Sequence, residues 1–181
     1  LASMDPSTRP SLTYGRTTFV YYDVQTRMPE AAVPDVKNKS WTLSADIVTT
    51  HAEHGVIITQ GGLFGGWALY LAEGKPVFCY NMLGLTSMEL RGQQVLTPGK
   101  HTIIFHFEYD PAGGTGKGGN GTLLVDSAQV AEGSIGATVP IRFGFDEGMD
   151  VGEDTGTPVN LDYDVPFDFT GDIQQVVVSI G

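Results

Sequence analysis

Hydrophobic and polar positions alternate along several short segments of the chain. In residues 41–47, and again in residues 102–109, every second side chain is apolar and most of those between are polar. Successive side chains of a β-strand point to opposite faces, so a period of two predicts a strand with one buried and one wet face. Both segments are therefore predicted to be half-buried strands.

Continuous apolar runs predict strands that are covered on both faces. Residues 56–60 (VIITQ) form such a run, and residues 66–82 predict a hairpin that turns at AEGKP. Residues 83–96 fit either short strands around Met88, Leu90 and Val95 or a turn of helix. Further strands are predicted at residues 17–22, 122–126, 129–132, 139–145 and 172–180.

The fold class follows from the number of these short segments and the turns between them. The 24 Gly and 10 Pro are scattered rather than periodic, which is typical of many turns. No segment has the period of an amphipathic helix. We therefore predict an all-β fold, an antiparallel β-sandwich or jelly roll, with an irregular lead-in at residues 1–16 and a single domain at residues 17–181.

Composition narrows the classes of ligand. The net charge is −11, which disfavours nucleic acid and anionic membrane surfaces and leaves cations and neutral, hydroxyl-rich ligands. No apolar run reaches the ~20 residues of a membrane span. The single cysteine, Cys79, excludes an internal disulfide and leaves the compartment open: periplasmic, extracellular or cytoplasmic.

The segment 143–159 (FGFDEGMDVGEDTGTPV) carries five carboxylates within residues 146–154. Such carboxylates repel one another unless a cation, an arginine, backbone amides or solvent lies among them. Ca²⁺ takes six to eight oxygen ligands, and Asp146, Asp150 and Asp154 are candidates to supply them. The alternatives are a solvated loop or pairing with an arginine from elsewhere in the fold, such as Arg27, Arg91 or Arg142.

Aromatic side chains are the candidates for sugar binding. The faces of Trp67, Tyr70 and Tyr80 offer apolar surface to a sugar ring, and the alternative for each is packing in the core. Lys117 lies among glycines in GGTGKGGNGT, which does not match the phosphate-binding G-x-x-x-x-G-K-[ST] pattern. We predict that Lys117 reaches a partner surface from a flexible loop.

No complete catalytic set is evident, so enzymatic activity stays open. Cys79 has no basic neighbour that would favour a thiolate. The paired carboxylates of a glycosidase, spaced E-x-D-x-x-E on one strand, do not occur in any predicted strand. We therefore predict no catalytic residue in this chain.

Long motifs give a resemblance to a family. The chain resembles the C-terminal domain of bacterial arylsulfatases in RPSLTYGRTTFVYY, PDVKNKSWTLSADI, QGGLFGGWALYLAEGKPVFCYNMLGL, LTPGKHTIIFHFEYD, GGTGKGGNGTLLVD and VGEDTGTPVNLDYDVPFDFTGDI. The resemblance extends from Arg9 to the C-terminus. It implies a concanavalin A/laminin G-like sandwich that packs on a separate sulfatase catalytic domain and shapes access to its site.

The resemblance also implies where the chemistry of such an enzyme lies. The C-x-P-x-R motif of the sulfatase catalytic domain is absent, since Tyr80, Asn81 and Met82 follow Cys79. This chain is therefore expected not to hydrolyse sulfate esters by itself. The alternative to the accessory role is a carbohydrate-binding jelly-roll module, stabilised by calcium, with a glycan as its partner.

Overall fold

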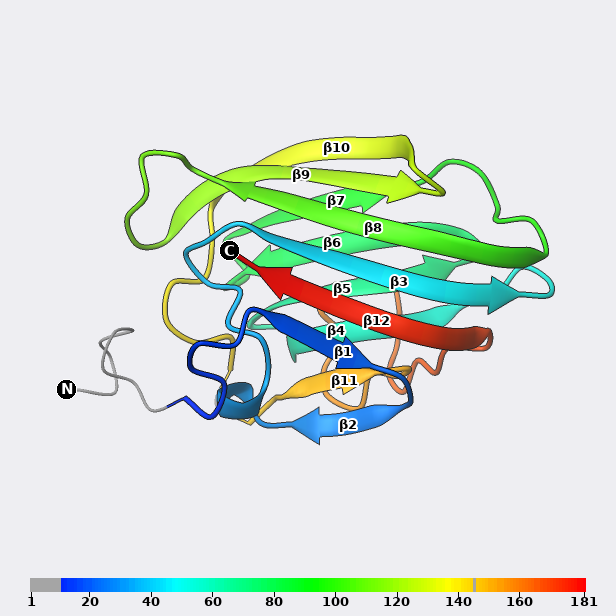
Figure 1. The fold of residues 1–181 in the computed structure, drawn as a ribbon, viewed down its shortest axis with the longest axis horizontal. Helices are drawn as coiled ribbons and strands as arrows, with labels where there is room; N and C mark the ends of the chain where they lie inside the picture. Colours follow the sequence, from blue (N-terminus) through cyan, green and yellow to red (C-terminus); the bar gives the residue numbers. More distant parts are fainter. Residues whose placement is uncertain (1–10, 145) are drawn as a thin grey trace.

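The computed structural model describes residues 11–144 and 146–181, which form two stacked antiparallel six-stranded sheets (Figure 1). Sheet A, in front in Figure 1, contains, in spatial order, β1 (Thr18–Tyr21), β12 (Asp172–Ile180), β3 (Trp41–Thr49), β8 (Gly99–Tyr109), β9 (Lys117–Val125) and β10 (Ala128–Ala137). Sheet B contains β2 (Gln25–Met28), β11 (Met149–Val151), β4 (Gly55–Gly62), β5 (Gly65–Ala72), β6 (Lys75–Met82) and β7 (Thr86–Arg91). The predicted antiparallel β-sandwich is confirmed.

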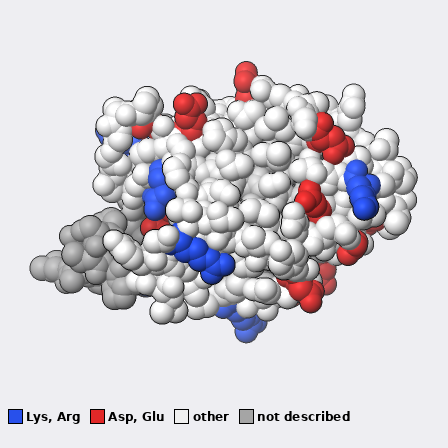
Figure 2. Space-filling view, in the orientation of Figure 1, with Lys and Arg blue, Asp and Glu red and all other residues white. Residues whose placement is uncertain are grey.

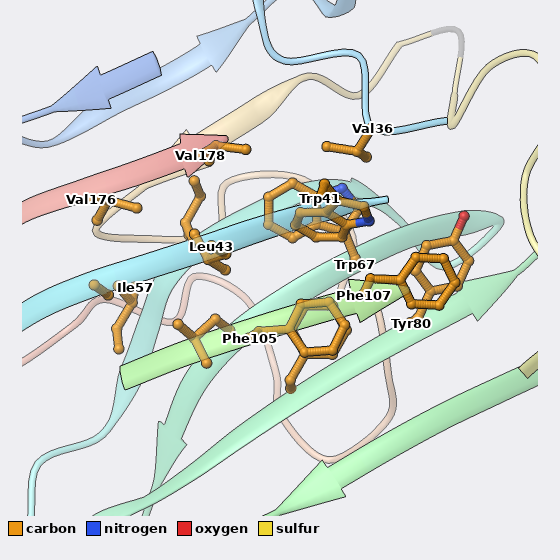
Figure 3. Close-up of a cluster of buried hydrophobic side chains, with 14 of the residues drawn as sticks. Val36, Trp41, Leu43, Ile57, Trp67, Tyr80, Phe105, Phe107, Val176 and Val178 are labelled. Carbon is orange, nitrogen blue, oxygen red and sulfur yellow. The ribbon is translucent and has the colours of Figure 1, made fainter. Parts of the chain in front are cut away.

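The main core lies between the sheets. Every second residue of β3 is buried, as its alternation predicts, and Trp41 and Leu43 point inward from it. Trp41 meets Trp67 of sheet B with ring centroids 4.9 Å apart, and Phe105 of β8 lies edge-on to Trp41 at 5.2 Å. Figure 3 shows these rings together with Val176 and Val178 of β12. Tilted and edge-to-face contacts of this kind add to the stabilisation that burial provides.

The central strands of sheet B are buried on both faces. Every residue of β4 is buried, as are nearly all residues of β5 and β6. Sheet A covers their inner face, and residues 152–170, here called the cover segment, pack on the outer face. There Val159 and Tyr163 join Val56 and Tyr70 in a second, smaller core. The continuous apolar run at residues 56–60 reflects this double burial.

Gly55 allows the cover segment to approach β4 closely. Its φ of +108° is unfavourable for other residues, and a β-carbon there would lie 2.0 Å from the carbonyl oxygen of Asp168. Next to it, the amide of Val56 donates a hydrogen bond to the carbonyl of Phe167 (3.0 Å). The end of the cover segment is thereby fixed against sheet B.

Several predicted boundaries are wrong. Residues 139–144 contain no strand, and Phe145 lies outside the described residues. The preceding strand is instead longer than predicted, since β10 continues to Ala137. The predicted loop at residues 23–38 contains β2 and the 3-10 helix η2 (Glu30–Ala32), and the acidic stretch contains β11.

The glycine-rich segment is less loop-like than predicted, because β9 begins at Lys117. A β-carbon at Gly118 would lie 1.9 Å from the carbonyl oxygen of Ile135, so a glycine is needed for β9 and β10 to pair here.

The first and last strands of the sandwich, β1 and β12, are neighbours in sheet A. Thr18 of β1 pairs with Ser179 of β12, so the start of β1 lies beside the end of β12. Within the described residues, nothing helical has the length and apolar character of a membrane span.

Candidate functional site

A groove of about 450 Å³ lies on the outer face of sheet B, over β6 and β7. The register pairs Cys79 with Glu89 and Asn81 with Ser87, so these four side chains project from the same face of the sheet. Cys79 and Asn81 are buried beneath the groove, Ser87 and Glu89 are exposed along one side, and residues 159–162 of the cover segment line it too. The groove therefore exists because a loop is packed on a sheet face.

Tyr163 anchors the wall of this groove. Its ring is buried between Tyr70 (centroids 5.1 Å apart) and Phe167 (5.0 Å). Its hydroxyl donates to a carboxylate oxygen of Asp154 (2.8 Å) and accepts a hydrogen bond from the amide of Val159 (3.1 Å). One side chain thus holds two separate parts of the cover segment against the sheet.

A polar network connects the two sides of the groove. The Nδ2 of Asn160 donates to Glu89 Oε2 (3.1 Å) and to the hydroxyl of Tyr70 (3.2 Å). The Tyr70 hydroxyl donates to Asp162 Oδ2 (3.2 Å). Arg91 completes the ring by ion pairs with Glu89 (Nε to Oε1, 3.1 Å) and with Asp162. Each polar group is therefore held in a defined orientation before any ligand arrives.

The groove network has one excess negative charge, because the two carboxylates of Glu89 and Asp162 share the one guanidinium of Arg91. Burial opposes the charged form of Arg91, but the hydrogen bond and the charge of Glu89 outweigh it and raise the pKa of Arg91 further. Burial raises the pKa of Tyr70 and of the Cys79 thiol, and nearby carboxylates add to both shifts. Tyr70 and Cys79 are thus neutral, so Cys79 is no nucleophile here.

Asn81 ties together the segments around the groove. Its Nδ2 donates to the carbonyl of Leu63 (2.8 Å) in the β4–β5 turn and to that of Val159 (3.1 Å) in the cover segment. Its Oδ1 accepts a hydrogen bond from the amide of Gly84 (2.8 Å) in the β6–β7 turn. All three hydrogen bonds of this one amide thus join backbone segments, and Asn81 fixes the shape of the groove.

The predicted sugar-binding residues are not brought together at a surface. Trp67 and Tyr70 are fully buried (0% exposed), and the ring of Tyr80 lies in the main core (Figure 3). Their burial leaves no ring face free to stack on a sugar, because the main core and the cover segment occupy those faces. Lys117 is exposed at the start of β9 in the other sheet. Of the four, Tyr70 belongs to the network described above.

The three predicted calcium ligands line one cavity of about 430 Å³, together with Arg27 and Arg142. Asp150 accepts hydrogen bonds from the amide of Arg27 (2.5 Å) and from the amide and hydroxyl of Thr155 (both 2.7 Å). Asp154 is also buried and accepts from the amide of Gly156 (3.0 Å) and from Tyr163, whereas Asp146 is exposed.

Backbone amides and hydroxyls thus satisfy the buried carboxylates of the acidic stretch. Burial, reinforced by the charges of Asp150 and Glu147, raises the pKa of Asp154 to about 6. Within residues 11–144 and 146–181, no three His, Cys, Asp or Glu side chains are grouped so as to hold a metal ion. Calcium binding stays a prediction.

Of the network, the sequence pointed to Tyr70 as a sugar-binding residue and to Arg91 as a partner of the acidic stretch, but not to Glu89, Asn160 or Asp162. The alternation in TSMELR places Ser87, Glu89 and Arg91 on one face of a strand, and this pattern could have identified them. No local signal identifies Asn160 and Asp162, since their position depends on the path of the cover segment across sheet B.

Comparison with known proteins supports the fold. No protein-family model matches the sequence, and no curated protein does either. Domains LG4-5 of the mouse laminin alpha1 chain align with a TM-score of 0.57 at 15% identity, over 91% of this chain and 39% of that one. The CBM40 of the Ruminococcus gnavus IT-sialidase, bound to alpha2,3 sialyllactose, aligns with a TM-score of 0.55 at 16% identity, over 79% of this chain and 76% of that one.

This chain thus spans well under half of the laminin structure it resembles. At these identities the likeness concerns the fold alone, and it agrees with the predicted laminin G-like sandwich. The arylsulfatase resemblance stays a prediction. The chain is similar in architecture to laminin G domains and to a carbohydrate-binding module of family CBM40.

Proposed function

We propose that this chain is a non-catalytic carbohydrate-binding module and that the groove over β6 and β7 is its binding site. The observation that carries the proposal is the fixed network of Glu89, Arg91, Asn160 and Asp162 at a groove on a sheet face. Planar carboxylates, amides and guanidinium groups can each bond two neighbouring hydroxyls, which is the arrangement that sugars present. A solved structure of similar fold, the CBM40, holds a sugar.

The charges at the groove favour uncharged sugars. Glu89 and Asp162 carry two negative charges, and the single guanidinium of Arg91 is paired with both of them. An acidic sugar would bring a carboxylate toward these groups, and no Lys, Arg or His is among the described residues that line the groove to receive it. The proposed ligand therefore differs in charge from the sialyllactose of the CBM40 structure.

A glycan microarray followed by titration calorimetry tests the proposal. We expect binding to neutral glycans, and about a tenfold weaker affinity for both Glu89→Ala and Asn160→Ala, because each loses a hydrogen-bonding group at the groove. Ser179→Ala, on the exposed face of sheet A, is the matched control and should bind as the wild type does. An array without binding, or affinities unchanged in both groove variants, would refute the proposal.

A further inference from the structure

Five exposed apolar side chains lie on the three segments that border one end of the groove. We call them the apolar rim: Leu63 and Phe64 of the β4–β5 turn, Leu83 and Leu85 of the β6–β7 turn, and Leu161 of the cover segment. Phe64, Leu85 and Leu161 are 76%, 75% and 85% exposed. Leu63, Leu85 and Leu161 also line the groove itself, so the rim is continuous with the proposed sugar site.

The rim is held in place rather than carried on loose loops. All three of its segments are bonded to the one amide of Asn81, through the carbonyls of Leu63 and Val159 and the amide of Gly84. The side chain of Leu83 lies close to Gly65, where an added β-carbon would be 3.2 Å from it. Hydrophobic groups gathered and fixed at a surface mark a binding surface, because exposure to water is unfavourable for them.

We infer, resting on the proposed function, that the groove binds glycosides whose aglycone is apolar. The sugar lies beside Ser87, Glu89 and Asn160, and the aglycone covers the apolar rim at Leu85 and Leu161. A sugar alone would satisfy the polar part of the groove and leave the adjoining leucines in water. A ligand with both parts matches the polar and apolar surfaces that the groove joins.

The test compares methyl and hexyl glycosides of β-glucose, β-galactose and β-N-acetylglucosamine by titration calorimetry. We expect the hexyl form of the bound sugar to bind about tenfold more tightly than its methyl form, since about two buried methylenes suffice for this gain. In Leu85→Ser/Leu161→Ser the ratio of the two affinities should fall to about one. Val95→Ser removes another exposed apolar side chain, beyond the other end of β7, and should keep the wild-type ratio.

The outcomes separate this inference from the proposed function. Equal affinities for methyl and hexyl glycosides would overturn the inference and leave sugar binding intact. No binding of any of these glycosides would overturn the inference too, and only an array without binding would also remove the proposed function. A hexyl advantage that survives in Leu85→Ser/Leu161→Ser would also overturn it, because the gain would then arise elsewhere. Binding of sugar-free phosphatidylcholine vesicles, lost in the same double variant, would show that the rim serves a lipid surface and contradict the inference.

Discussion

The outer faces of the two sheets differ in what covers them. On sheet A, the register aligns Val20, Val177, Ser44, Ile104 and Leu124 in one row across the strands, and each is half-buried. The middle of this face is largely free of charge, and most charged side chains lie toward its margins (Figure 2). On sheet B, the cover segment buries the strands and brings charged side chains together. The outer face of a sheet thus forms a groove where a loop packs on it, as on sheet B, and remains an open surface where none does, as on sheet A.

The largest expected effect comes from removing the anchor of the cover segment. Tyr163→Ala should lower the free energy of unfolding by about 3 kcal/mol, because it opens a cavity in the second core and removes the hydrogen bonds to Asp154 and Val159. Urea unfolding measures this. Ile104→Ala, on the uncovered face of sheet A, should cost about 1 kcal/mol or less. Equal losses in the two variants would contradict the contrast between the faces.

The buried carboxyl group of Asp154, in the cover segment, should make the stability of the fold depend on pH. Burial, together with the charges of Asp150 and Glu147, raises the pKa of Asp154 to about 6, above the ~3.9 of an unfolded chain. At a pH between these two pKa values, Asp154 is protonated in the folded state and ionised in the unfolded state. The contribution to stability is therefore complete below about pH 4 and is lost as the pH rises through 6.

Stability curves of the wild type and of Asp154→Asn isolate this contribution, since asparagine does not titrate. Between pH 4 and pH 7 the wild type should lose on the order of 2 kcal/mol relative to the variant. Parallel curves for the two proteins would show that Asp154 does not carry a raised pKa.

The network at the groove should affect binding more than stability. Asp162→Asn removes the charge that pairs with Arg91 but keeps the shape of the side chain. Because both groups are partly exposed, we expect a stability loss of about 1 kcal/mol or less, and a several-fold weaker affinity for the glycan found on the array. Loss of folding with retained affinity per folded molecule would assign Asp162 to the fold instead of the site.

The smallest effect on stability is expected from His101, at the other end of the sandwich. Its Nδ1 lies 2.7 Å from Asp126 Oδ2 and its Nε2 lies 2.6 Å from the carbonyl of Thr97, so both nitrogens face acceptors. Burial alone would lower the pKa of His101, but these two hydrogen bonds outweigh it and raise the pKa above 6.5. The stabilisation is full below the unfolded pKa and fades as the pH rises through the folded one.

A proton NMR titration should therefore show His101 with a midpoint above 6.5, and Asp126→Asn should lower it. Asp23→Asn, which changes an exposed aspartate before β2, is the control and should leave the midpoint in place. A midpoint that does not move in Asp126→Asn would contradict the ion pair.

The fold could be predicted because the burial of a strand determines the pattern of apolar residues in its sequence. The alternation at Trp41–Ile47 records one buried face of β3, and the apolar run at Val56 records two buried faces of β4. The acidic stretch concealed β11, because only Met149 and Val151 face the core and Asp150 lies between them. A strand of three residues is too short to show a period.

The candidate site was harder to predict, for a different physical reason. Glu89 and Asp162 are joined through Arg91 only because Tyr163 and Gly55 allow the cover segment to pack closely on sheet B. Such contacts between residues far apart in sequence depend on the packed fold and leave no periodic signal. The sequence could not separate sugar-binding from core aromatic residues, because a large apolar ring can either stack on a sugar or pack in a core.

The pairing of β1 with β12 has a practical consequence. The start of β1 and the end of β12 lie together in sheet A, whereas the groove opens on the far side of sheet B. A tether fused at this edge would hold the molecule by its plain sheet and present the groove outward. The domain is therefore suited to oriented display on a sensor chip or a bead, where many grooves facing the same way would gain avidity for a multivalent glycan.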